Sequence, residues 1–205
     1  MPATKVRPRT KPPQQRRDEL MDAAQRLFLK QGVASTTIDQ ITSSADIAKG
    51  TFYLHFSSKD DLLVALGEQF ANRHLGRITA AIARKPRADW IAKLATWAEA
   101  SVTFYLDSIR LHDMLFYESR SPTRKGLVEN VAIDHLTVLL EAGAVAGAWS
   151  IDDARVTAVF LFSGMHAVVD DAYLRERRIA RGRLIRRMQR ICHRAVGLSG
   201  DISGI

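Results

Sequence analysis

The segment between residues 37 and 59 gathers side chains that can bind the phosphate backbone of nucleic acid and the edges of its bases. A lysine can contact a phosphate or a guanine edge, and hydroxyl and imidazole groups can donate hydrogen bonds to phosphate oxygens. Glycine has no side chain, so the backbone beside it can approach a groove closely. The residues expected to contact DNA are Thr37, Lys49, Gly50, Thr51, Tyr53, His55 and Lys59.

These side chains lie on a pattern that predicts two short helices joined by a tight turn. Ile38 and Ile41 give the first helix an apolar side, and Ala45 is small enough to let the next helix cross closely. Asp46 lies at the turn, where Asp tolerates the left-handed conformation better than most residues do. Phe52 is expected to point inward from the second helix. Two helices joined in this way form a helix-turn-helix, whose second helix enters the major groove of DNA.

The same segment contains a specific motif of eleven residues, each at a fixed spacing from the next. They are Thr37, Ile41, Ala45, Ile47, Gly50, Thr51, Tyr53, His55, Phe56, Lys59 and Leu62. In this motif the chain resembles the TetR (tetracycline-repressor) family of bacterial transcription regulators, and residues 17–32 resemble that family's first helix. Asp46 and Thr42 depart from the family, which usually has Gly and Ala there. The resemblance implies the same DNA-contacting residues as the side-chain chemistry, although a place in the core is the alternative for Tyr53 and His55.

Composition is that of an ordinary globular protein, with 46% hydrophobic and 25% charged residues in a chain of 205. No apolar run approaches the roughly 18 residues that a transmembrane helix needs, and no apolar region follows the basic amino terminus as in a secretory signal. A single cysteine, Cys192, cannot form an internal disulfide and is expected to be a small buried residue, an intermolecular bridge being the alternative. A cytoplasmic protein without membrane contact is therefore expected.

The charge is concentrated at the two ends of the chain. Residues 1–60 hold ten basic and six acidic residues, residues 61–174 hold eleven and fourteen, and residues 175–205 hold nine arginines against two acids. The expected organisation is a disordered basic arm at 1–14, a DNA-binding domain at 15–58, a helical effector-binding and dimerisation domain at 59–198 and a flexible tail at 199–205. The arm could follow a phosphate backbone or a minor groove, or it could be only a solubilising leader.

Beyond the motif the chain is expected to be helical throughout, which makes the fold all-α with about nine helices. The apolar residues recur at helical spacing, and no segment alternates as a strand does. Asp153, three residues after Ser150, is typical of a capping box at a helix start. Outside the two short helices of the motif, the expected helices span about 15–30, 59–84, 87–106, 109–117, 122–145, 150–174 and 179–196.

The last two expected helices carry more apolar surface than a terminal pair needs, and the resemblance implies a two-fold dimer in which they form a four-helix bundle. The residues expected at this interface are Val156, Phe160, Gly164, Ala167, Leu184, Met188 and Ile191. Arginines on another side of the last helix are expected to face solvent or to pair with acids, direct DNA contact being the alternative. A dimer would hold two recognition helices at the spacing of two half-sites, which predicts a roughly palindromic operator in double-stranded DNA.

The middle helices combine aromatic and methionine side chains with a few polar ones, which is typical of a mostly apolar ligand pocket. Plain core packing is the alternative for each of these residues. The expected effector is a small, largely apolar or aromatic molecule. The residues expected to line its site are Trp97, Ser101, Phe104, Met114, Phe116, Tyr117, His135, Phe162 and His166.

The function that these observations favour is a ligand-responsive repressor, not an enzyme, in which the effector selects a form of the dimer that binds DNA poorly. One alternative is a weakly specific architectural DNA-binding protein without an effector. An enzyme would need acid, base or nucleophile geometry that the sequence does not display. No cofactor or metal is expected, since structural histidines explain His112, His135 and His166 better than a metal site shared with Asp170 does.

Overall fold

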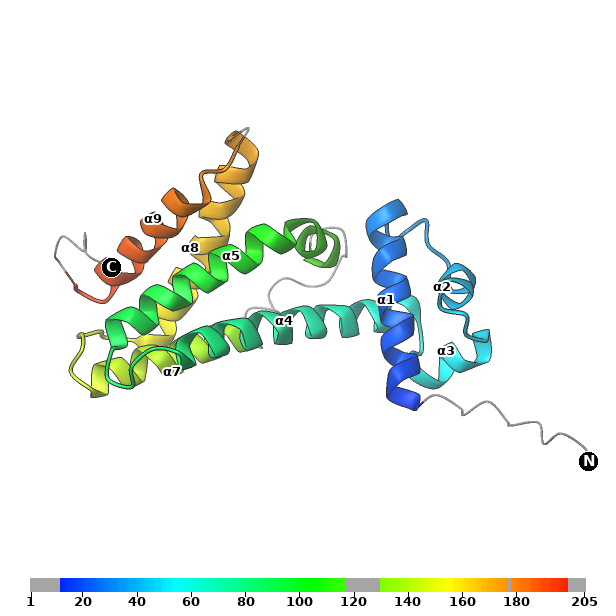
Figure 1. The fold of residues 1–205 in the computed structure, drawn as a ribbon, viewed down its shortest axis with the longest axis horizontal. Helices are drawn as coiled ribbons and strands as arrows, with labels where there is room; N and C mark the ends of the chain where they lie inside the picture. The colour runs from blue at the N-terminus through cyan, green and yellow to red at the C-terminus, as the bar shows by residue number, and fades with distance from the viewer. Residues whose placement is uncertain (1–11, 117–129, 177, 199–205) are drawn as a thin grey trace, which may run out of the picture. The chain divides into compact units, whose positions relative to one another are not determined.

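The computed structural model describes residues 12–116, 130–176 and 178–198, and within these ranges the chain forms eight helices and no strand. The predicted all-α fold is confirmed. One compact unit runs to Gly67 and includes the end of α5 from Asp113, and a second contains the rest of the described chain. The helices are α1 (Pro13–Gln31), α2 (Ile38–Ala45), α3 (Lys49–His55), α4 (Lys59–Ala83), α5 (Trp90–Phe116), α7 (Val131–Val145), α8 (Ala154–Arg175) and α9 (Arg181–Ala195) (Figure 1).

The first unit is built on α1, which packs against both α2 and α3 (Figure 1). Leu20, Ala24 and Phe28 recur on one side of α1 and are buried, as their spacing predicts. The helix ends at Gly32, where φ is 83° and the N–H donates to the carbonyl oxygen of Phe28. A residue without Cβ is favoured at such a positive φ.

Side-chain caps begin α2 and α4, and the cap of α2 is a capping box. The Thr37 hydroxyl accepts from the Gln40 N–H at 3.2 Å, and the Gln40 side chain accepts from the Thr37 N–H at 2.9 Å. At α4, the Ser58 hydroxyl accepts from the N–H of Asp61, whose carboxylate accepts from the N–H of Ser57, one residue before the cap. Each cap satisfies amides at the start of its helix, which favours the observed start of both helices.

In the second unit, α5 is one helix over Trp90–Phe116, so the prediction of a break between residues 106 and 109 is wrong. The intervening residues, Asp107 and Ser108, include neither Gly nor Pro, and Ile109 is buried in the same core as Tyr105. Core packing therefore continues across the predicted gap. Some of the expected elements lie outside the described residues. They are the basic arm up to residue 11, residue 117, the predicted helical segment at 122–129 and the tail at 199–205.

Side-chain caps also set the starts of α7 and α8. The Asn130 side chain accepts from the N–H groups of Ala132 and Ile133 before α7. Before α8, Asp153 is itself the cap and accepts from the N–H of Val156 at 2.9 Å, so the predicted start at Ser150 is corrected to Ala154. The sequence pattern predicts Asp153 as the third residue of a capping box that begins at Ser150. Asp is itself one of the preferred N-cap residues, which explains the later start.

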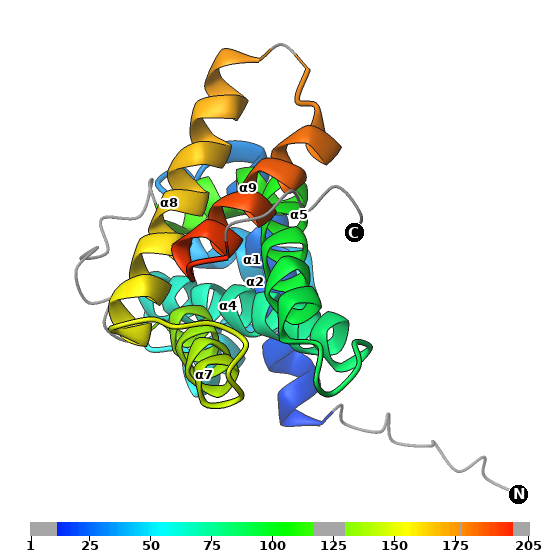
Figure 2. The same cartoon turned by 90° about the vertical axis from the view of Figure 1, so that its left-hand side faces the viewer.

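The core of the second unit joins α4, α5, α7, α8 and α9, and Figure 2 shows α8 beside both α7 and α9. Cys192 is fully buried in it, as expected, and burial raises the pKa of its thiol to about 12. The Trp149 indole N–H donates to the Leu140 carbonyl oxygen at 2.9 Å, and its ring lies against Gly143. None of the described helices is long and apolar enough to cross a bilayer.

The contact between Gly143 and Trp149 predicts a specific packing defect. A Cβ at position 143 would lie 2.0 Å from Trp149 Cζ2, so Gly143→Ala should displace the indole ring and lower the free energy of unfolding. Overpacking of this kind costs about 1–3 kcal/mol. Chemical denaturation monitored by tryptophan fluorescence measures the loss.

Gly76→Ala is the matched control, because nothing lies within 4 Å of a Cβ added at that exposed position of α4. It should stabilise the protein by up to about 1 kcal/mol, the usual difference between Gly and Ala inside a helix. A Gly143→Ala protein as stable as the parent would show that the ring is not held where the structure places it.

Candidate nucleic-acid interface and ligand core

The helix α3 is buried on one side and exposed on the other. Phe52 and Phe56 are 0% and 2% exposed, and the Phe56 ring also lies 5.1 Å from the Arg17 guanidinium carbon. Tyr53 and Leu54 are 52% and 81% exposed. Because the inner side of the helix fills the core of the first unit, the outer side is presented to solvent in a fixed orientation.

The turn before α3 has the conformation that the sequence predicts. Asp46 ends α2 with φ 53° and ψ 46°, the left-handed region, and its N–H donates to the Ser43 and Thr42 carbonyl oxygens. Asp reaches this region at a modest cost, whereas a β-branched residue would be strained there. The departure from the family's usual glycine therefore leaves the helix-turn-helix geometry intact.

The predicted DNA contacts on α3 lie on its exposed or half-exposed parts. Lys49, Gly50 and Tyr53 are exposed, and Thr51 and His55 are half-buried. Thr37 is exposed at the start of α2 and uses its hydroxyl oxygen as an acceptor in the capping box. The hydroxyl proton is thus left to donate to a phosphate oxygen.

Lys49 forms an ion pair that the sequence reasoning missed. Its Nζ lies 2.8 Å from Asp39 Oδ1 on α2, and both side chains are more than half exposed. The hydrogen bond to Asp39, followed by the charge of that carboxylate, raises the pKa of Lys49, so the ammonium group stays charged. The ten-residue separation joins two different helices, and no helical periodicity indicates such a pair.

Lys59 is already held by the protein. Its ammonium group donates to the Val33 carbonyl oxygen at 2.6 Å and to that of Thr36 at 2.9 Å, which ties the start of α4 to the segment before α2. An ammonium group has three N–H donors, so one remains for a phosphate. Lys59 therefore positions the segment that carries Thr37, and its contact with DNA stays a prediction.

In the second unit, α5 and α8 bring five of the expected effector residues into one buried region or its border. Trp97 and Ser101 are 0% exposed, one turn apart on α5, and neither Trp97 Nε1 nor Ser101 Oγ has a hydrogen-bond partner among the described residues. Phe104 lies further along α5, and Phe162 and His166 have rings 4.4 Å apart on α8. The other expected residues lie elsewhere. His135 is half-buried on α7 of the second unit, whereas Met114 and Phe116 belong to the first unit. Tyr117 lies outside the described residues.

Stacked histidines are a feature of this region that the sequence reasoning recognised only in part. The His74 ring stacks on Phe104 at 4.7 Å, and the His112 and His166 rings lie 5.5 Å apart beside Tyr105. Burial, followed by the charge that His166 would carry, lowers the pKa of both His74 and His112 to about 3. Burial also lowers the pKa of His166. The imidazoles are therefore neutral near pH 7, and the Arg77 guanidinium lies over Phe104 at the border of the region.

Asp170 has a hydrogen-bonding role here. Its Oδ1 accepts the Tyr105 hydroxyl at 2.6 Å, while His166 Nδ1 lies 2.9 Å from the carbonyl oxygen of Phe162, one turn back. In the described part of the chain, no group of three or more His, Cys, Asp or Glu side chains could hold a metal ion.

The structure leaves only some of the expected dimer-interface residues on the surface. Val156 and Phe160 of α8 are 64% and 67% exposed, Ala167 is exposed and Gly164 half-buried. Leu184 and Met188 of α9, by contrast, are buried in the core of their own unit and are not on its surface. The Gln189 side chain also donates to the Ala95 carbonyl oxygen, a further contact of α9 with α5 of its own unit. Ile191 is the expected α9 residue that remains exposed.

Known proteins resemble this chain most clearly in the first unit. Residues 20–66 match the family described as bacterial regulatory proteins, tetR family. The chain is 38% identical over 64 residues to YerO, an uncharacterized HTH-type transcriptional regulator of Bacillus subtilis (strain 168), over 31% of this chain and 22% of that protein. It is 40% identical over 55 residues to the HTH-type transcriptional regulator AcrR of Shigella flexneri, over 27% of this chain and 26% of that protein. The matches thus span less than a third of these relatives' length.

Solved structures are similar over nearly the whole chain. A bacterial regulatory protein in the tetR family from Rhodococcus RHA1 superposes with a TM-score of 0.69 and 25% identity, covering 90% of this chain and 98% of that one. The transcriptional regulator FadR from Bacillus subtilis, in complex with stearoyl-CoA, gives a TM-score of 0.69 at 19% identity over 89% and 99% of the two chains. The second likeness shows the fold alone.

The ion pair between Lys49 and Asp39 generates a prediction about DNA selectivity. Asp39→Asn should release the lysine and remove a negative charge beside the phosphates, so binding to DNA of arbitrary sequence should strengthen several-fold. The slope of log affinity against log salt should steepen by up to about one, the value for one added phosphate contact. Fluorescence anisotropy with a duplex of arbitrary sequence, at three salt concentrations, measures both.

Asp22→Asn is the control, because it removes the same charge from an exposed position on α1. If both variants strengthened binding equally, only net charge would matter and Asp39 would have no special place.

Proposed function

Because this chain is a TetR-family transcriptional regulator, we propose that it binds a palindromic operator as a homodimer and represses transcription until a small molecule releases it. DNA binding is placed in residues 15–58, and effector binding and dimerisation in residues 59–198. The family consists of transcription regulators and not of enzymes. The observation that carries the proposal is the one-sided burial of α3, which leaves Lys49, Gly50 and Tyr53 outward on a helix short enough for the major groove.

The proposed contacts divide into positioning and sequence readout. Thr37, Thr51, Tyr53 and His55 donate to phosphate oxygens and set the register of α3, with Lys59 adding one donor. Lys49 reads a guanine edge or neutralises a phosphate at the start of the helix. Leu54 is 81% exposed on the same helix and adds an apolar contact suited to a thymine methyl group. These contacts should make affinity fall steeply with salt.

The proposed dimer forms through the exposed side of α8. Val156, Phe160 and Ala167 follow one another at intervals of four and seven residues, so they share one side of the helix. Gly164 lies between them and lets a second helix approach closely, and Ile191 of α9 completes the set. An exposed phenylalanine within an apolar row is a usual feature of a protein–protein interface.

The proposed effector occupies the buried region around Trp97 and Ser101. Burying a polar atom without a partner costs about 1–3 kcal/mol, and a ligand that accepts from the indole N–H and the hydroxyl would remove that cost. A largely apolar ligand suits the neutral imidazoles of the same unit, and the stearoyl chain bound by the FadR neighbour has this character. The ligand lowers operator affinity only as far as it prefers the form that binds DNA poorly. Because α4 belongs to both units, we propose it as the connection.

Selection of random duplex DNA by the purified protein tests the DNA-binding proposal. We expect enrichment of one palindromic sequence, and Lys49→Ala or Tyr53→Ala should weaken its binding at least tenfold, about 1.4 kcal/mol. Val138→Ala on α7 is the control, because it trims an exposed apolar residue of the second unit and should leave affinity unchanged. Salt-sensitive binding without any preferred sequence would instead favour the weakly specific architectural protein.

The selected duplex also serves for a test of the release mechanism. Stearoyl-CoA and a neutral long-chain alcohol are suitable probes, and Ser101→Ala should weaken the binding of whichever probe lowers operator affinity. The release mechanism would be contradicted by a probe whose binding depends on Ser101 but which leaves operator affinity unchanged.

A further inference from the structure

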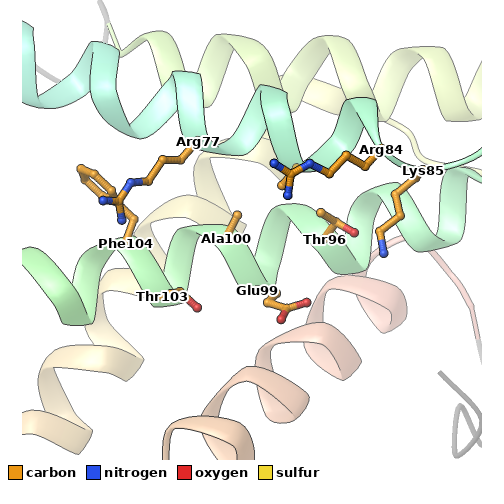
Figure 3. A pocket seen from close by; sticks show the side chains of 9 residues that line it. Arg77, Arg84, Lys85, Thr96, Glu99, Ala100, Thr103 and Phe104 are labelled. Carbon is orange, nitrogen blue, oxygen red and sulfur yellow. The ribbon is translucent and has the colours of Figure 1, made fainter.

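A groove on the second unit lies between the end of α4 and the first half of α5, and it borders the histidine-rich region at Phe104 (Figure 3). It encloses about 330 Å³, near the lower end of the size of small-molecule sites. Three of its lining residues are cations and only one is an acid, and small or aromatic side chains such as Ala100 and Phe104 form its apolar part. The charged residues are Arg77, Arg84, Lys85 and Glu99.

The cations at the two ends of the groove are held differently. The Arg77 guanidinium lies 5.2 Å from the centre of the Phe104 ring and 3.8 Å from a carboxylate oxygen of Asp107. Arg84 and Lys85 form no ion pair with the described residues, and both are exposed. The unneutralised positive charge is therefore concentrated where α4 ends.

A hydroxyl group lies beside these two cations. Thr96 lines the groove and is only 7% exposed, and no described residue forms a hydrogen bond with its side chain. Figure 3 shows Arg84 and Lys85, in the turn directly after α4, extending toward α5 at the end where Thr96 lies, with Arg77 and Phe104 at the other end. In the same view Glu99 projects from α5 on the side away from α4.

We infer that this groove is a second ligand site, which binds a small phosphate ester. A guanidinium group offers paired N–H donors that match two phosphate oxygens, and the Lys85 ammonium and the Thr96 hydroxyl can donate to the remaining ones. The apolar part of the ester lies along Ala100 toward Phe104. Arg77 precedes Arg84 by two helical turns, about 10 Å along the axis, so the groove is longer than a lone phosphate ion and accommodates an organic group beyond it.

Calorimetric titration of the full chain with phenyl phosphate, in low salt and without DNA, tests this inference. We expect binding at least tenfold tighter than that of benzoate, which carries a single charge, and tighter than that of inorganic phosphate, which has no apolar part. Arg84→Gln and Lys85→Gln should each weaken phenyl phosphate binding at least fivefold. Arg73→Gln, which removes one charge from an exposed position of α4 outside the groove, should leave it unchanged.

Three outcomes would overturn the inference. They are no measurable binding of phenyl phosphate, equal binding of phenyl phosphate and benzoate, or equal losses in Arg73→Gln and Arg84→Gln. A loss of duplex DNA affinity in Lys85→Gln without any loss of phenyl phosphate binding would assign the groove to nucleic acid instead. Circular dichroism of each variant confirms that it is folded, and because no operator is involved, the result is independent of the proposed regulatory function.

Discussion

The structure of the first unit depends on the burial of one side of α3. A helix of seven residues is unstable in isolation, because its few hydrogen bonds do not offset the free-energy cost of helix nucleation. Here Phe52 and Phe56 fix it against the rest of the unit, the left-handed Asp46 sets its direction, and Lys59 ties the neighbouring segment to the start of α4. The outer side chains are consequently presented by a rigid base, which is what the proposed contacts of Lys49 and Tyr53 with DNA require.

The second unit combines a closely packed core with polar groups that the described protein does not satisfy. Trp97 and Ser101 are fully buried with unpartnered polar atoms, whereas Tyr105 and Asp170 satisfy each other. Protein interiors normally pair such groups, so the exceptions mark where a ligand or water belongs. The basic end of the groove between α4 and α5 is chemically opposite to this region, since its charge suits an anion and the neutral imidazoles suit an apolar molecule. The two proposed sites of this unit therefore differ in the class of ligand that each would bind.

The sequence sufficed for those features that are encoded locally. The apolar spacing of α1, its end at Gly32 and the cap of α2 at Thr37 all depend on residues that are close in sequence. Contacts between distant residues were not predictable, as with Lys59 and Val33, or with Lys49 and Asp39. The misplacement of Leu184 and Met188 has the same cause, because an apolar row on a helix does not reveal whether its own subunit or a partner covers it. The uninterrupted α5 shows that the absence of Gly and Pro predicts continuity better than a change in apolar spacing does.

The central claim is that two copies of α3 reach DNA at one fixed separation, and changing the spacing of the half-sites tests it most directly. Insertion of one, two or five base pairs at the centre of the selected operator should weaken binding progressively, by at least tenfold at five, because the insertion turns one half-site to the opposite side of the duplex. Each bound duplex should hold two chains or a multiple of two by analytical ultracentrifugation. Affinity that is independent of the inserted length, with one chain bound per half-site, would contradict the account.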